Sequence, residues 1–285
     1  MSFCVNITFL YNVAHKFHTY TLLQALSLLC ETVKEHSGIK SKKRTKKEKT
    51  SGSPWLHMDD SFLQLFDSIS SRIVHLIDDS TNASDSSLKV AAVSAIEILA
   101  SAFPSYHSTI SVWLASIGKY ITSNNLTLSS SCLRTCGTLI NVLGPRSLSE
   151  LPNIMGKVIN VSRSCVVENT RGSSEISVQS SDLRDSVMLS VAITLEAVVE
   201  KLGGFLNPYL GDMLELLVLH PNLVWGADSK LKLKADFIRN LLTEKIPVSV
   251  VICEFGRYSS YNCSCFIYLI IAKSISRFVL CCHLC

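Results

Sequence analysis

The sequence predicts an all-α protein, and three observations support this prediction. Apolar residues recur every three or four positions over long stretches, which places them on one face of a helix. Glycine and proline are scarce, at 12 and 7 of 285 residues, which argues against turn-rich all-β folds. With 47% apolar and 18% charged residues, the chain can build a substantial core, so wholesale disorder is excluded.

Eight helices in four pairs are predicted between residues 59 and 247. The first helices of the pairs are expected to begin near residues 60, 106, 151 and 208, and the second helices near 87, 130, 181 and 228. Two of the clearest apolar stripes consist of Ile110, Trp113, Leu114, Ile117 and Ile121, and of Leu183, Val187, Val191, Leu195, Val198 and Leu202. Prolines 104, 145, 152, 208 and 221 fall at predicted helix edges. Gly144 is placed where a helix end needs a left-handed residue.

A leucine followed by a basic residue recurs in the second helices. The register consists of Leu88-Lys89, Leu133-Arg134, Leu183-Arg184 and Leu231-Lys232, spaced by 45, 50 and 48 residues. Helix pairs repeating every 40 to 47 residues or so are typical of HEAT and armadillo solenoids. We therefore expect a HEAT-type α-solenoid of about four pairs, with a Ser-rich loop at 162–182 lengthening the third unit. Each basic residue is expected near solvent at the start of its helix.

The remaining segments are assigned different roles. Residues 1–36 are predicted to form an N-terminal helical segment, a partial repeat whose helix covers 20–35. Residues 37–58 are predicted to be a basic flexible linker. After Pro247 the sequence turns β-branched, aromatic and Cys-rich, without helical period. We interpret 248–285 as an atypical tail that is not native to the fold, of the kind a retained intron or alternative exon would produce.

The net charge of +4 comes from one short run. Seven of the 27 basic residues and one of the 23 acidic residues lie in 40–49, so the rest of the chain has a net charge of −2. The basic residues of this run are Lys40, Lys42, Lys43, Arg44, Lys46, Lys47 and Lys49. Such a run is typical of a nuclear import signal or of contact with RNA phosphates. The alternative is a solvated linker with no partner, and no interleaved aromatic residues indicate base stacking.

The sequence carries no signature of an enzyme, a cofactor site or a metal centre. It lacks GxGxxG, GxxxxGK[ST], HExxH and GxSxG. The cysteines and His283 of the tail have poor spacing for zinc. We therefore expect no catalytic residues, cofactor, metal or small-molecule substrate. The longest apolar stretch, 266–280, is short for a bilayer and contains Lys273 and Arg277, so no membrane span is expected.

Three stretches, 133–155, 183–210 and 230–247, look like HEAT units. Together they resemble the very large HEAT-repeat subunit of the nucleolar small-subunit processome, the U-three small nucleolar RNA-associated protein ten family, and its plant members in particular. The resemblance covers roughly residues 20–247. It implies a non-catalytic nucleolar scaffold for pre-18S ribosomal RNA processing, linked to ribosomal DNA transcription. The implied partners are other processome proteins and pre-ribosomal or small nucleolar RNA. Members of the family are several times longer than this chain, and from Ser249 the sequence departs from the family.

Two other functions stay open at this point. A HEAT-repeat adaptor in nuclear transport would bind basic cargo on an acidic inner surface, but acidic residues do not recur at a fixed position of the predicted register. Another protein-binding scaffold would share the architecture. An enzyme is disfavoured because no catalytic motif is present.

Overall fold

A computed structural model describes residues 60–78, 86–170, 178–219 and 229–246. All regular secondary structure in these ranges is helical, as the sequence predicted. Several predicted features lie outside the described residues: the helix over 20–35, the linker 37–58 with its basic run, Pro221, and the tail 248–285.

Eight α-helices occupy the described ranges close to the predicted positions. They are α2 (Asp60–Asp78), α3 (Ser86–Ala102), α4 (His107–Gly118), α5 (Leu126–Leu143), α6 (Leu151–Thr170), α7 (Val178–Leu202), α8 (Leu210–Leu219) and α10 (Ser229–Lys245). Short 3₁₀ turns follow α5 at Gly144–Ser147 and precede α8 at Gly203–Phe205 and Asn207–Tyr209. None of these helices is long and apolar enough to cross a membrane.

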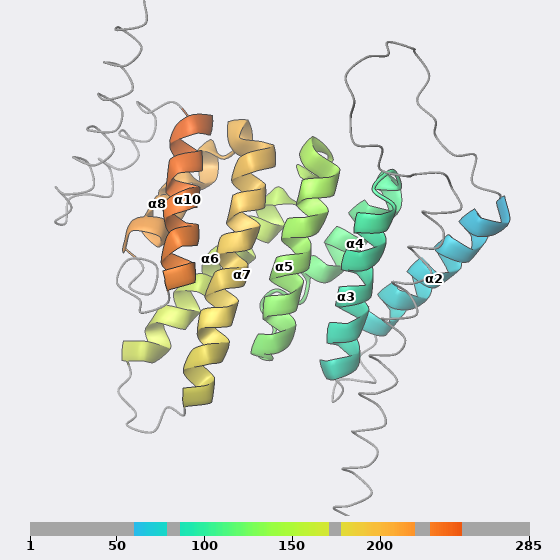
Figure 1. The fold of residues 1–285 in the computed structure, drawn as a ribbon, viewed down its shortest axis with the longest axis horizontal. Helices are drawn as coiled ribbons and strands as arrows, with labels where there is room; N and C mark the ends of the chain where they lie inside the picture. Colours follow the sequence, from blue (N-terminus) through green and yellow to red (C-terminus); the bar gives the residue numbers. More distant parts are fainter. Residues whose placement is uncertain (1–59, 79–85, 171–177, 220–228, 247–285) are drawn as a thin grey trace, which may run out of the picture.

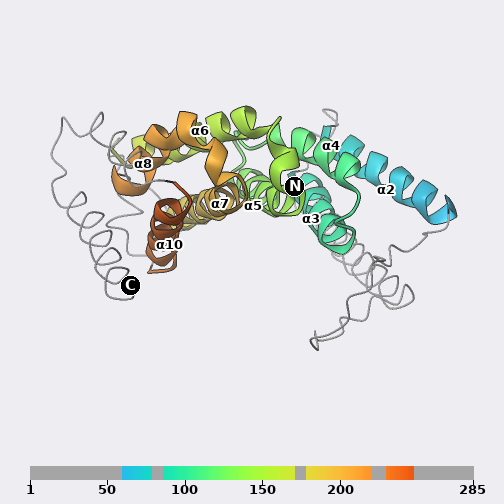
Figure 2. The same ribbon diagram turned by 90° about the horizontal axis from the view of Figure 1, so that it is seen from above.

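The helices form two layers (Figure 1). Helices α3, α5, α7 and α10 lie side by side in one layer, and each packs against its neighbour in that order. Helices α2, α4, α6 and α8 form the other layer. Seen from above, both rows curve, with α3, α5, α7 and α10 on the concave side (Figure 2). We call the concave row the inner layer and the other row the outer layer.

The apolar stripes of the sequence meet between the layers. All five stripe residues of α4 and its following turn, from Ile110 to Ile121, are fully buried. In α7 the stripe from Val187 to Leu202 is buried as well, but Leu183 is 42% exposed, so its prediction as a core residue is wrong. Burying such side chains contributes roughly 1.5–3 kcal/mol each. The apolar stripes therefore supply most of the energy that holds the two layers together.

An aromatic cluster fixes α2 to the rest of the array. The ring of Phe66 lies 5.4 Å from that of Phe103, 4.6 Å from that of Tyr106 and 5.9 Å from that of Trp113, centroid to centroid. The buried indole nitrogen of Trp113 donates a hydrogen bond of 2.8 Å to the hydroxyl of Ser70 on α2. The polar atom of the largest core side chain is thereby satisfied, as burial requires.

The prediction of a Ser-rich loop at 162–182 is wrong for most of this range. Helix α6 continues to Thr170, and α7 already begins at Val178. The hydroxyls of Ser162 and Ser164 donate to the carbonyls of Ile159 and Val161, at 2.7 and 2.8 Å. Serines that satisfy their hydroxyls on the helix backbone stay helical, although composition alone suggests a loop. By contrast, Gly144 ends α5 with the positive φ of 55° that the sequence predicted.

The two central helices of the inner layer, α5 and α7, approach closely at Gly137. A Cβ atom on Gly137 would lie 3.3 Å from the Cα of Thr194 and 3.4 Å from the carbonyl oxygen of Ile193. Both of these atoms belong to backbone, which cannot turn aside as a flexible side chain can. Gly137 therefore sets how near the two helices come.

Replacing Gly137 by Val is expected to lower the free energy of unfolding by about 2 kcal/mol, because the added methyl groups force the two backbones apart. Gly156→Val is the matched control, since a Cβ atom on Gly156 in α6 would have no neighbour within 4 Å. The control should be neutral or slightly stabilising, because Val has the higher helix propensity. Urea unfolding followed by circular dichroism measures both. Equal effects of the two variants would show that the close approach is unimportant.

Candidate interaction surface

Each inner-layer helix, together with Phe103 just after α3, buries four residues at the same spacing. The quartets are Ala92, Ile96, Leu99 and Phe103; Cys132, Cys136, Leu139 and Leu143; Val191, Leu195, Val198 and Leu202; and Leu231, Ala235, Ile238 and Leu242. In every quartet the residues are four, three and four positions apart, which is one face of a helix. The first residues of successive quartets are 40, 59 and 40 positions apart. The quartets thus define a structural register that recurs along the row.

At each junction of the inner layer, one pair of residues that meet occupies the same two positions of this register. On the first helix of a junction, the residue of the pair lies five positions after the first residue of the quartet. On the second helix, its contact partner lies three positions after the first residue of that helix's quartet. The pairs are Glu97 with Thr135, Gly137 with Thr194, and Glu196 with Lys234. Three junctions therefore use one pair of positions with three different chemistries.

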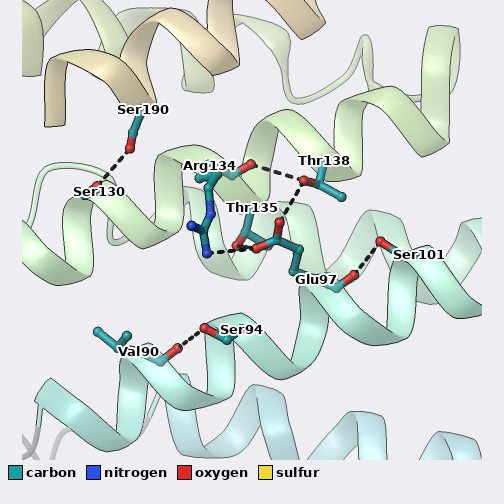
Figure 3. A network of polar contacts seen from close by, with 9 residues as sticks. All are labelled: Val90, Ser94, Glu97, Ser101, Ser130, Arg134, Thr135, Thr138 and Ser190. Carbon is teal, nitrogen blue, oxygen red and sulfur yellow. Dashed lines mark hydrogen bonds and ion pairs between the residues drawn. The ribbon is translucent and has the colours of Figure 1, made fainter. Parts of the chain in front are cut away.

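The α3–α5 junction is polar and centres on the carboxylate of Glu97 (Figure 3). One carboxylate oxygen lies 3.4 Å both from Arg134 Nη2 and from Thr135 Oγ1, and the other accepts from Thr138 Oγ1 at 3.3 Å. Glu97 therefore has three donors from the neighbouring helix. Such a carboxylate acts as a link between helices, and its acceptor capacity is largely used.

Close packing and hydroxyl groups join α5 and α7 at their junction. Thr194 Oγ1 donates across the junction to the carbonyl oxygen of Leu133 at 2.7 Å. The hydroxyls of Ser130 and Ser190 lie 2.8 Å apart (Figure 3). Small side chains let the helices approach, and the hydroxyls then satisfy each other or the facing backbone.

The α7–α10 junction contains an ion pair, as the α3–α5 junction does. Lys234 forms an ion pair with Glu196, and its ammonium lies 5.8 Å from the ring centroid of the exposed Phe237. Just beyond the end of α7, Gly203 lies beneath Lys245. A Cβ atom on Gly203 would come 2.8 Å from the Cβ of Lys245, so this position needs glycine for the two helix ends to meet.

Polar links also join neighbouring helices of the outer layer. Lys119, after α4, pairs with Asp78 of α2 at 3.1 Å, and Lys157 of α6 donates to the carbonyl oxygen of Gly118 at 2.8 Å. Arg163 of α6 pairs with Glu215 at 2.7 Å and Asp212 at 2.8 Å, both on α8. The hydrogen bond to Glu215, assisted by Asp212, raises the pKa of Arg163 further above its ordinary value. Each outer helix is thus tied to its neighbour by at least one charged side chain.

Lys89 does not lie near solvent as its place in the predicted register implied. Its side chain is buried, with 8% of the residue exposed, and its ammonium donates to the carbonyl oxygen of Ile77 at 2.9 Å. The same ammonium lies 4.8 Å from the ring centroid of Tyr120. The carbonyls of a final helical turn have no partner within the helix. Lys89 therefore caps the end of α2 from the start of α3 and has a structural role.

The other three basic residues of the predicted register occupy different environments. Arg134 is exposed near the middle of α5, not at its start. Arg184 is half-buried in α7, and Lys232 is exposed in the first turn of α10. The leucines before them also differ, since Leu133 and Leu231 are buried while Leu183 is exposed. The register of Leu-basic pairs is therefore not a structural repeat, and the register of buried quartets takes its place.

The described residues include no group of three or more His, Cys, Asp or Glu side chains placed to hold a metal ion. The basic residues Lys40 to Lys49 lie outside the described ranges.

Two buried thiols lie one above the other in the α5 quartet. Burial raises the pKa of Cys132 to about 12. Burial, with a smaller contribution from Cys132, also raises the pKa of Cys136 well above its ordinary value. The thiolate is the reactive form of cysteine, so both residues are inert core side chains near neutral pH.

Comparison with known proteins finds one informative relative. The chain is 43% identical over 230 residues to an uncharacterized protein of Arabidopsis thaliana. The match covers 80% of this chain and 10% of the relative, so the chain spans about a tenth of the relative's length. No family model matches the chain, and no solved structure matches it.

The buried thiols predict a protection pattern against alkylation. At a pH just below the ordinary thiol pKa of 9.0, iodoacetamide should leave Cys132 and Cys136 unmodified in the folded protein and modify both in concentrated urea. Above pH 9.0 the unfolded chain releases the Cys132 proton while the folded chain keeps it until about pH 12. The contribution of Cys132 to the free energy of unfolding should therefore fall as the pH rises from 9.0 to about 12. Peptide mass spectrometry reports the modification, and rapid labelling of the folded protein would contradict the assignment.

Substitutions of Lys89 and Lys232, which occupy the same position of the Leu-basic register, test whether that register is a structural repeat. Lys89→Met should lower the free energy of unfolding by about 1–2 kcal/mol, because the Ile77 carbonyl loses its buried donor. Lys232→Met should change it by less than about 0.5 kcal/mol, as expected for an exposed side chain. Denaturant titration of the two variants measures the difference. Equal losses would restore the register of Leu-basic pairs.

Proposed function

We propose that the described helices form a HEAT-type α-solenoid. The observation that carries this proposal is the recurrence of one buried quartet and one pair of junction positions along the inner layer. Two of the three intervals between quartets are 40 residues, inside the range of about 40–47 residues that is typical of HEAT and armadillo units. The interval of 59 residues contains the long helix α6, residues 171–177 and about the first half of α7. Added residues within a repeat lengthen its period without changing the stacking.

On this architecture we propose a non-catalytic scaffold of the nucleolar small-subunit processome, acting in ribosome biogenesis. Pre-18S ribosomal RNA processing is the central process, with a link to ribosomal DNA transcription. The support is the resemblance of 133–155, 183–210 and 230–247 to the processome family. The Arabidopsis relative, some ten times longer than the matched segment, has the great length which that resemblance implies.

The proposed mechanism is the presentation of an extended curved surface. A row in which each unit contacts only its neighbours has no central pocket, so binding is distributed over many helices. Other processome proteins would bind the solenoid surface. The basic residues Lys40 to Lys49 would contact the phosphates of pre-ribosomal or small nucleolar RNA, or direct nuclear import.

A nuclear transport adaptor is the second candidate, and the junction chemistry disfavours it. Such an adaptor needs free carboxylates on its inner surface for basic cargo. In the inner layer, Glu97 already has donors from Arg134, Thr135 and Thr138, and Glu196 is paired with Lys234. These carboxylates are occupied by the neighbouring helix, which leaves less negative charge for cargo.

The test is affinity purification of the full tagged chain from nuclear extract after cross-linking, with sequencing of bound RNA and identification of bound proteins. We expect enrichment of pre-ribosomal RNA and processome subunits. Replacing the seven basic residues of 40–49 by Gln should reduce RNA recovery severalfold if the run binds phosphate, because each lost contact removes counterion release. Replacing the exposed Arg146, Lys201 and Lys232 by Gln removes positive charge from the described part of the chain and is the control.

Recovery of transport factors without ribosomal RNA would favour the adaptor. Recovery of neither class would refute both functions while leaving the helical architecture unaffected.

A further inference from the structure

One face of α10 exposes two large apolar side chains that the packing of the helices does not use. Leu233 and Phe237 are 68% and 51% exposed, and Leu233 is the most exposed large apolar side chain of the described residues. The two residues lie four positions apart, so they are neighbours on the helix surface. The buried quartet that begins at Leu231 occupies the opposite side of the helix. Single exposed apolar residues are ordinary, whereas adjacent ones favour a contact surface.

The same face is basic. Helix α10 contains five basic and two acidic residues, and its net charge of +3 is the highest among the described helices. Lys230 is exposed and lies three residues before Leu233 and seven before Phe237, which places it on their face. The ammonium of Lys234 lies 5.8 Å from the ring centroid of Phe237. An exposed aromatic ring therefore lies beside two lysines.

The carboxylates close to this face already have cationic partners. Glu196 of α7 is paired with Lys234, and Asp236 is paired with Arg239. These pairs offset the negative charge beside the ring, so an anionic partner approaching Lys230 and Phe237 meets a net positive surface.

The combination of an exposed ring and lysines fits a single-stranded nucleic acid. Its bases stack on aromatic side chains, and its phosphates are attracted by lysines. An acidic peptide would also be attracted by the lysines, but it has no flat base to stack on the ring. The basic run from Lys40 to Lys49 has no interleaved aromatic residue, so it offers phosphate contacts without stacking. The face of α10 offers the stacking group that this run lacks.

We propose that the α10 face, defined by Lys230, Leu233 and Phe237, binds single-stranded RNA. One base stacks on the ring of Phe237, the next packs against Leu233, and a phosphate is held by Lys230. The choice of RNA as the nucleic acid rests on the proposed function, whereas the stacking surface rests on the exposure and charge of α10.

The test measures RNA binding by the purified full chain in which the seven basic residues of 40–49 are replaced by Gln, so that the α10 face is isolated from the basic run. The probe is a fluorescein-labelled oligouridylate of 12 nucleotides, followed by fluorescence anisotropy. This chain should bind the probe, and Phe237→Ala and Phe237→Leu should each weaken binding about fivefold or more. Phe237→Tyr should bind like the parent, because it keeps the ring. Lys230→Gln should lower the slope of log affinity against log salt by about 0.7.

Phe205→Ala is the matched control for the ring. Phe205 is 55% exposed in the turn after α7, so the variant removes a ring of similar exposure from another surface. Arg72→Gln is the matched control for charge, because Arg72 is exposed on α2. Both variants should bind the probe like the parent chain.

A measurement without substitution locates the contact directly. After photo-crosslinking of a 4-thiouridine oligonucleotide to the same parent chain, mass spectrometry should place a nucleotide on the tryptic peptide of residues 235–239, which contains Phe237. Cross-links that lie only on other peptides would overturn the proposal.

Three binding results would also overturn it. They are no binding of the probe by the parent chain, equal binding by Phe237→Ala and the parent, and full affinity in Phe237→Leu. The last result would show an apolar contact of the kind a peptide makes. The proposed function is tested separately in nuclear extract. Failure to recover ribosomal RNA there would refute that function and leave the stacking surface, whereas recovery with no effect of Phe237→Ala on oligouridylate binding would do the reverse.

Discussion

The close approach of α5 and α7 at Gly137 is the constraint on which the rest of the array depends. These helices are central in the inner layer, and their backbones come near enough for Thr194 to donate to the Leu133 carbonyl. That separation fixes where the α5 and α7 quartets meet the outer layer, and hence where α4 and α6 lie. A larger side chain at 137 would move both neighbours, because a close-packed interior transmits displacement instead of absorbing it.

The remaining junctions show why one position can carry different chemistries. Burial of the quartets contributes several kcal/mol for each helix, whereas one partly exposed polar link contributes about 1 kcal/mol or less. The apolar face therefore decides that the helices stack, and the junction residue decides spacing and register. Glycine brings α5 and α7 together, while Glu97 and Glu196 hold their neighbours with a longer polar bridge.

How much of this the sequence predicts depends on the range of each interaction. The helices and the fully buried stripe from Ile110 to Ile121 follow from local period, which one chain displays directly. The burial of Lys89 does not, because its partner is a backbone carbonyl at Ile77, which belongs to another helix. The sequence alone does not single out the quartet register, because its positions hold Ala, Cys, Val, Ile, Leu and Phe, while the Leu-basic pairs have the more uniform composition. Different apolar residues can occupy equivalent buried positions when the total side-chain volume across the interface is conserved.

These interactions use charged side chains of the described helices to hold neighbouring helices together. These charged side chains already have partners on neighbouring helices. Arg163 pairs with two carboxylates, Glu97 accepts from three donors, and Lys89 contacts a carbonyl oxygen and an aromatic ring. A side chain already held by its neighbours gains little by binding a partner, since binding must first break an existing contact. On the proposed scaffold, recognition would use groups that the stacking does not occupy. In the sequence, the run from Lys40 to Lys49 offers such groups. The residues that hold the row together are therefore different from those that the proposed function assigns to a partner.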